Sequence, residues 1–324
     1  SAASTQPTIT QPNMTGSGPI VSPAATTTST SGGSIAIDPS TTAPPLQSGF
    51  TEPVQKMVRF CNNFMFDYTF IPRGNEGLGL NELKVSSRFM LPCSILPPSK
   101  ENQESNFFFI APAFSVDFWS NPKHPHDYYF GMPKSTFDAN LAFGLNPQFN
   151  KDFSMEAWLQ LGIASSFKKI NKHALYLRGL ATGTLSITED GSFKATGGIK
   201  YLDRNRYKLL PVAGVIWTPN EKNVWRLVFP DPKLSHHLGK NNETDWWAYV
   251  CGDIGGGRWL IDAGDTFNID YNDYRFGGGL TFVRSNSFTG HFEVGGAFGR
   301  ELYAYGTKLY KPKTSVYLKV GLGF

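Results

Sequence analysis

The segment from Thr314 to Phe324 constrains the fold more than any other part of the chain. Its apolar residues occupy alternate positions: Val316, Leu318, Val320, Leu322 and Phe324. Because successive side chains of a β-strand point to opposite faces, this segment has one apolar face and one polar or small face. It also ends on an aromatic residue, whereas the fraying ends of soluble chains are usually polar. The segment therefore favours a membrane barrel strand over a soluble one.

The same residues resemble the C-terminal signature of bacterial outer-membrane β-barrels. In that class the last strand closes the barrel, and the barrel-assembly machinery binds its aromatic end. The resemblance implies that Val316, Leu318, Val320, Leu322 and Phe324 form a barrel-assembly signal. The class pattern also has a glycine where this chain has Lys319, and here glycines stand at Gly321 and Gly323 instead.

The composition agrees with a membrane barrel. Hydrophobic residues make up 40% of the 324 residues and charged residues only 17%, which is low for a soluble domain of this size. Aromatic residues reach 14%. No stretch approaches the roughly twenty consecutive apolar residues of a transmembrane helix. A membrane barrel hides its apolar residues in alternation, which agrees with the mean hydropathy of -0.26.

The net charge, the first residue and the cysteines limit the binding partners and covalent bonds that we expect. The net charge of +4 is spread along the chain, so we expect no nucleic-acid partner. A start at Ser1 fits an exported protein whose leader has been removed. Cys61, Cys93 and Cys251 leave at least one thiol unpaired; a disulfide between the first two and three isolated thiols both remain open. No spacing indicates a metal site, and we expect no cofactor.

The chain divides into two regions. Residues 1–50 are rich in Ser, Thr, Pro and Ala, with almost no charge and no periodicity. Such a segment cannot bury enough apolar surface to offset its ordering entropy, so it is predicted to be a flexible periplasmic tail. We expect it to contact other protein subunits when it is ordered. Residues 51–324 are predicted to form an outer-membrane barrel.

Strand-like segments of about ten residues fill the second region. Phe153 to Ile163 alternates most regularly, and Pro, Gly, Asn and Asp separate the segments. Twelve or thirteen strands can be counted, and single-chain bacterial barrels close with even numbers. The prediction is an all-β transmembrane antiparallel barrel of about twelve strands, with fourteen as the alternative. A soluble β-sandwich is disfavoured, because the apolar faces carry too much Phe and Trp and the opposite faces too few charges.

The middle of the chain carries a second resemblance. Tyr201 to Arg204, then Leu210, Pro211, Val212, Gly214, Trp217 and Pro219, then Trp225 and Phe229 to Pro232 are similar to a family of uncharacterised outer-membrane barrel proteins of Planctomycetota and related bacteria. The similarity runs from about Phe153 to Phe324. It implies the location and the fold and leaves the activity open.

If the apolar face is outward, the polar face lines the lumen. That assignment places nine positive and six negative residues inside: Arg59, Lys84, Arg88, Arg178, Lys194, Lys200, Arg226, Arg275 and Lys319, with Asp67, Asp138, Glu156, Asp253, Asp273 and Glu293. Solvated, they would make a weakly anion-selective pore; paired across a narrow lumen, they would help to plug it. Lumen aromatics, among them Tyr176, Tyr249 and Tyr317, favour the plugged form.

We therefore expect a membrane protein in outer-membrane lipid that acts as an anchor or complex subunit of a larger cell-envelope assembly. A passive porin-like channel for small solutes is the alternative, and a surface enzyme is a distant third. No GxSxG, HExxH or phosphate-binding loop is present, so the chain is predicted not to be an enzyme. His124, His126, Asp127, His236 and His237 are interpreted as ordinary polar loop residues.

Overall fold

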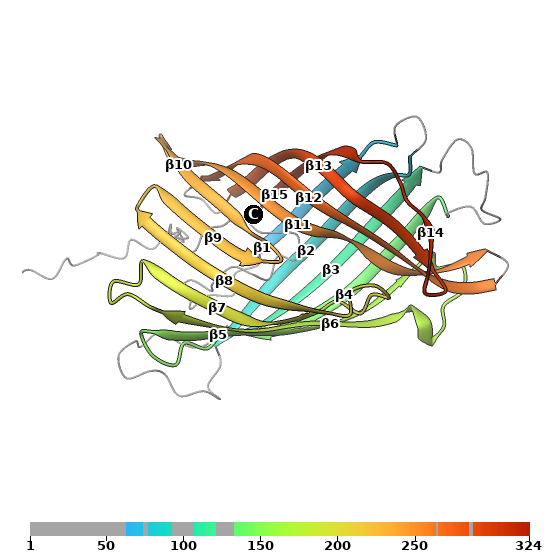
Figure 1. Ribbon diagram of the computed structural model, residues 1–324, viewed down its shortest axis with the longest axis horizontal. Coiled ribbons are helices and arrows are strands. Elements are labelled where there is room, and N and C mark those ends of the chain that lie inside the picture. Colours follow the sequence, from blue (N-terminus) through green and yellow to red (C-terminus); the bar gives the residue numbers. More distant parts are fainter. Residues whose placement is uncertain (1–62, 74–76, 93–106, 121–132, 264, 285–287) are drawn as a thin grey trace, which may run out of the picture. The chain divides into compact units, whose positions relative to one another are not determined.

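The computed structural model describes residues 63–73, 77–92, 107–120, 133–263, 265–284 and 288–324. This part of the chain is all-β, with one three-residue 3-10 helix at Lys172–Ala174. The strands, drawn in Figure 1, are β1 (Asn63–Ile71), β2 (Gly79–Pro92), β3 (Phe107–Ser120), β4 (Ser135–Leu145), β5 (Phe153–Ser165), β6 (Leu175–Ser186), β7 (Phe193–Tyr201), β8 (Leu209–Asn220), β9 (Asn223–Phe229), β10 (Lys233–Asn241), β11 (Thr244–Ala263), β12 (Asp265–Arg284), β13 (Phe288–Ala304), β14 (Thr307–Tyr310) and β15 (Ser315–Gly323).

The strands close into an antiparallel barrel. Each strand from β1 to β13 pairs with the next, and β15 pairs with both β13 and β1. Strand β14 adds only a short ribbon to β13. The wall therefore contains β1 to β13 and β15, which is fourteen strands. This confirms the predicted all-β barrel and selects the larger of the two strand numbers.

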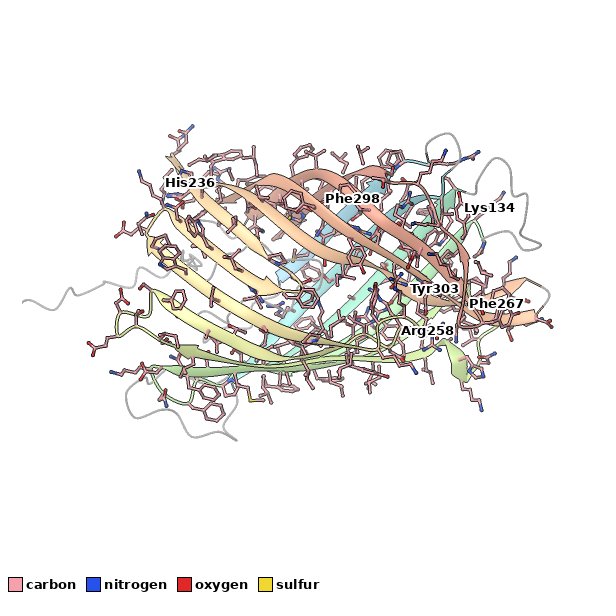
Figure 2. All side chains as sticks on the ribbon, viewed as in Figure 1. Lys134, His236, Arg258, Phe267, Phe298 and Tyr303 are labelled. Atoms are coloured by element: carbon pink, nitrogen blue, oxygen red, sulfur yellow. The ribbon has the colours of Figure 1, made fainter. Side chains whose placement is uncertain are left out.

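Side chains alternate across the wall as expected for strands. In β15, Val316 and Leu322 are exposed on the outer side, while Tyr317 and Lys319 are buried on the inner side. Large apolar side chains cover the outer surface on nearly every strand, as Phe298 does in Figure 2. The structure places all five residues of the predicted assembly signal on this outer parity: Val316, Leu318, Val320, Leu322 and Phe324.

Both ends of the barrel sequence lie at one end of the wall. The backbone N–H of Phe64 donates to the carbonyl of Phe324 (3.1 Å), and the N–H of Phe324 donates to the carbonyl of Phe64 (2.9 Å). We call this the termini end, and His236 in Figure 2 lies toward it. The opposite end, marked by Lys134 and Phe267 in Figure 2, is called the loop end. The predicted tail and Arg59, Cys61, Cys93, His124, His126 and Asp127 lie outside the described residues.

At the loop end the circle of strands that encloses the interior becomes smaller. Strands β11 and β12 extend far beyond β9 and β10 (Figure 1). There Leu260 of β11 pairs with Ser165 of β5, and the N–H of Ser166 donates to the carbonyl of Leu260 (2.9 Å). The bend in β11 lies at Gly256, where φ is +97° and an added Cβ would meet the carbonyl oxygen of Tyr271 at 2.0 Å. Only glycine fits that conformation without strain.

Candidate functional site: the interior of the barrel

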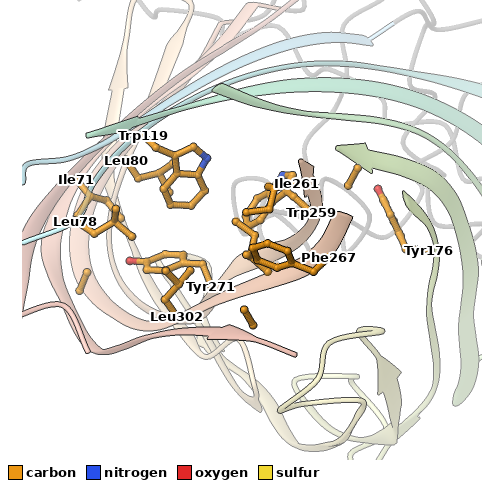
Figure 3. Close-up of a cluster of buried hydrophobic side chains, with 14 of the residues drawn as sticks. Ile71, Leu78, Leu80, Trp119, Tyr176, Trp259, Ile261, Phe267, Tyr271 and Leu302 are labelled. Carbon is orange, nitrogen blue, oxygen red and sulfur yellow. The ribbon is translucent and has the colours of Figure 1, made fainter. Parts of the chain in front are cut away.

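An apolar core fills the interior at the loop end. Trp119 of β3 makes edge-to-face contacts with Trp259 (5.3 Å between ring centroids) and Tyr271 (5.7 Å). Leu, Ile and Ala side chains from several strands complete the core, as Figure 3 shows. Because β5 and β11 meet at this level, the enclosed circle of strands is small enough for side chains to fill it. We call this cluster the axial core.

A buried arginine secures one side of the axial core. Arg300 of β13 is 1% exposed. Its Nε donates to the hydroxyl of Tyr271 (2.7 Å), Nη1 donates to the carbonyl of Lys313 (3.2 Å), and Nη2 donates to the carbonyl of Leu78. These bonds connect β13, β12 and the segments before β2 and β15, so the core is closed by polar contacts as well as apolar ones.

A layer of charged side chains lies against the axial core toward the termini end. The hydroxyl of Tyr176 donates to Asp138 (2.6 Å) and accepts from Gln160 (3.1 Å). Arg178 lies over the ring of Tyr176 (4.1 Å) and 3.8 Å from Asp138. Arg178 of β6 and Asp138 of β4 are therefore paired across the intervening β5, as the plugged alternative requires.

Two more ion pairs, one on β12 and one between β7 and the turn after β9, make a similar arrangement. Arg275 and Asp273 of β12 form an ion pair (3.1 Å), and Tyr271 donates to the same carboxylate (2.8 Å). Lys200 of β7 bonds to Asp231 in the turn between β9 and β10 (2.8 Å). Each charge has lost most of its water and gained an opposite charge, which is the condition for ionised side chains to stay buried.

Glu293 of β13 organises a third group nearer the termini end. Its carboxylate accepts hydrogen bonds from Tyr249 (2.9 Å) and Tyr317 (2.6 Å), and it interacts electrostatically with the buried Lys319. Cys251, the free cysteine of the described residues, is buried in the same group. His291 lies on β13 as well, and its Nε2 is 3.4 Å from the carboxylate of Asp67 in β1.

Two cavities of about 140 Å³ each lie among the described residues of the barrel interior. The first lies among β5 to β9 and mixes apolar side chains with Thr hydroxyls, Glu156, Lys194 and Arg226. The second lies beside the axial core and is lined by equal numbers of acids and bases. Glu156 is within electrostatic range of Arg226, Arg88 and Lys200. We call the cavity among β5 to β9 the mixed cavity and the cavity beside the axial core the charged cavity.

The loop between β7 and β8 closes the wall beside the charged cavity. Arg204 donates to the carbonyls of Gly255 (2.8 Å) and Gly256 (2.5 Å) in β11, and the N–H of Asn205 donates to Asp270 (2.5 Å). Burial lowers the pKa of Arg204 to about 10, so the guanidinium stays charged at neutral pH. We call residues 202–208 the wall loop.

Four further contacts of arginine and tyrosine side chains attach the wall loop to its neighbours. Arg258 of β11 lies 3.3 Å from Asp203. Arg206 pairs with Glu301 and donates to the hydroxyl of Tyr303 (3.2 Å), and Tyr207 bonds to Tyr274. Figure 2 shows Arg258 and Tyr303 together at this part of the barrel.

The structure places the sequence-derived lumen residues on the inner wall. Lys84, Asp138, Arg178, Lys200, Asp253 and Arg275 line the charged cavity, and Glu156, Lys194 and Arg226 line the mixed cavity. Arg88 lies over the ring of Phe109, which is buried in the interior, and Asp273, Glu293 and Lys319 are also buried. Asp67 faces His291. The sequence reasoning missed Arg204, Asp231, Asp270, His291 and Arg300.

Two histidines differ from the sequence interpretation. His236 and His237 lie in strand β10 and not in a loop. His236 contacts the side chain of Asn223 on the outer surface (2.8 Å), and His237 contacts Asp245 (3.2 Å). Within the described ranges, no three or more His, Cys, Asp or Glu side chains are grouped so that they could hold a metal ion. Among these same residues no helix has the length and apolar character to span a membrane.

Comparisons with models of protein families and with curated proteins found no match.

Proposed function

We propose that the chain is an outer-membrane β-barrel whose outer surface contacts lipid. Aromatic side chains near the termini end contact one another across the wall: Trp246, Phe282, Phe288, Phe324 and Phe66 form a continuous row with centroid separations of 5.4 to 6.1 Å. Near the loop end, Phe118 and Tyr274 are exposed. Aromatic girdles at both edges of an apolar band are typical of membrane barrels.

The same proposal makes the barrel an anchor or subunit of a cell-envelope assembly, with no catalytic role. The axial core is the observation that carries it, because it occupies the axis at the loop end. A barrel closed in this way does not work as a wide diffusion pore. What remains available for function is a stable membrane body with a tail that enters from the termini end.

Conductance of the reconstituted full-length chain tests the anchor role. We expect planar bilayers that contain the inserted protein to show little or no steady current. Removal of residues 1–50 should not change this result, because the axial core lies wholly in the barrel. Large and stable currents that are independent of the tail would refute the anchor and support an open porin.

The tail is proposed to bind other subunits on the periplasmic side. A barrel with an even number of strands has both ends of its sequence on one side, and here Phe64 and Phe324 are neighbours. Photo-crosslinkers placed at Ile20, Ile35 and Leu46 are expected to capture a protein other than this chain in the native envelope. Crosslinks to the barrel alone would remove this support.

A channel is the second candidate, and the two cavities favour it. Both lie in the interior, the charged cavity beside the axial core, and charged side chains line both. A channel of this kind would need a route that avoids the axial core.

A further inference from the structure

The wall of the barrel has a gap at the loop end, between β8 and β11. Strands β9 and β10 have only seven and nine residues, and their turn ends against β11, where the N–H of Gly252 donates to Pro232 (2.9 Å). Beyond that turn, residues 209–212 of β8 have no strand partner on the edge that faces β9. Residues 253–259 of β11 likewise have none on the edge that faces β10, within the described part of the chain.

The wall loop fills this gap with side-chain bonds instead of a strand ladder. Arg204 supplies the donors that a neighbouring strand would otherwise give to Gly255 and Gly256. Asp270 accepts from the backbone of the loop. A strand ladder spreads its backbone bonds over many residues, whereas here one guanidinium and one carboxylate make the bonds between side chains and backbone across the gap, and the side chains of Asp203, Arg206 and Tyr207 add contacts to Arg258, Glu301 and Tyr274. Loss of either group therefore loosens the loop, which its other side-chain contacts still attach, and leaves the rest of the wall paired.

The charged cavity lies directly behind the loop. Leu202 and Arg204 line it, together with Asp253, Gly256 and Gly257 of β11. The axial core closes the interior at the loop end, and the wall loop closes the gap beside the charged cavity. The route past the core therefore leads through the gap.

We propose that the wall loop is a side gate, and that its displacement opens the charged cavity through the wall between β8 and β11 to small polar solutes. The cavity is lined by five acids and five bases: Glu82, Asp117, Asp138, Asp231, Asp253, Lys84, Arg178, Lys200, Arg204 and Arg275. Such balanced charge suits a small zwitterion such as glycine, since a ring of one sign would instead select one ion. The inference rests on the proposed membrane location and not on the anchor role.

Swelling of liposomes in glycine tests the gate. The variants are Arg204→Ala, which removes both bonds to β11, and Asp270→Ala, which removes the acceptor of the loop backbone. Trp119→Ala is the matched control, because it leaves a cavity in the axial core and does not change the wall loop. Each charged hydrogen bond that is lost shifts a closed–open equilibrium about tenfold, so the two bonds to β11 that Arg204→Ala removes shift it about a hundredfold, and we expect this variant to swell about a hundred times faster than the unaltered chain. Asp270→Ala is expected to be intermediate, and Trp119→Ala to stay at the background rate.

The controls separate the possible failures. Flotation with vesicles and heat-dependent migration in gels show which variants insert and fold; a chain that does not float with the vesicles refutes the membrane location instead of the gate. If Arg204→Ala does not fold, Asp270→Ala decides. Folded variants of the loop that stay at background overturn the gate. A rate for Trp119→Ala equal to or above that of the loop variants assigns the route to the axis and also overturns it.

Discussion

Replacement of Leu159 by arginine tests whether the outer surface lies in lipid. Leu159 is on the outer side of β5, where its side chain is 45% exposed, and six residues of the strand lie on either side of it. At about 3.3 Å per residue, Leu159 lies roughly 20 Å along the strand from each end. A strand tilt of about 40° reduces this to roughly 15 Å in depth, at the centre of an apolar band about 25 Å tall.

The magnitude follows from that depth. An arginine on the lipid face costs about 2–4 kcal/mol at the midplane and about 0–1 kcal/mol near the interface. Leu185 provides the matched control, because it is equally exposed (47%) but pairs with Phe153, the first residue of β5, beside the turns. We therefore expect Leu159→Arg to lower the unfolding free energy by about 2–4 kcal/mol and Leu185→Arg by less than about 1 kcal/mol.

Reversible denaturant unfolding in phospholipid vesicles, followed by tryptophan fluorescence, measures both variants against the unaltered chain. The two positions have nearly the same exposed fraction, so a barrel surrounded by water would tolerate them equally. Equal costs at Leu159 and Leu185 would therefore refute the lipid-facing assignment, even if both variants were less stable.

Two other substitutions test the interior. Gly256→Ala is expected to lower the unfolding free energy by about 1–3 kcal/mol, because φ is +97° and the new Cβ would meet Tyr271; Gly197→Ala, with no atom within 4 Å of the new Cβ, should cost much less in the same unfolding assay. Glu293→Gln leaves Lys319 buried, at 5% exposure, without its opposing carboxylate, and we expect a loss of about 3–5 kcal/mol. A loss below about 1 kcal/mol would contradict the proposed pairing.

The parts of the fold that sequence predicted are those set by local strand geometry. The alternation in β15 predicted which side chains would be exposed, because a period of two holds wherever the backbone stays extended. Strand number was harder to predict, since β9 and β10 are short and the turn between them contains Pro230 and Pro232. The lumen aromatics Tyr176, Tyr249 and Tyr317 indicated a plugged interior, and all three are buried there.

Arg300 shows where alternation fails. In β13, Phe298 and Gly299 are both exposed, and Gly299 has a φ of +54°. Two successive residues on one side reverse the parity of everything that follows, as a β-bulge does. Arg300 therefore points inward, although its position in the sequence assigns it to the outer face. A glycine within a strand was the available signal, but the sequence alone does not say whether the alternation shifts at that glycine.

The axial core and the gap in the wall have one structural cause. Strand β11 pairs with β10 as far as Cys251, and at Leu260 it pairs with Ser165 of β5. One edge of a strand cannot pair with both neighbours at the same level, so the contact with β5 that narrows the barrel also separates β11 from β8. Arg204 then satisfies the carbonyls that the separation leaves unpaired. A change that straightens β11 at Gly256 would therefore affect the axial closure and the wall loop together, whereas a change confined to Arg204 affects the loop alone.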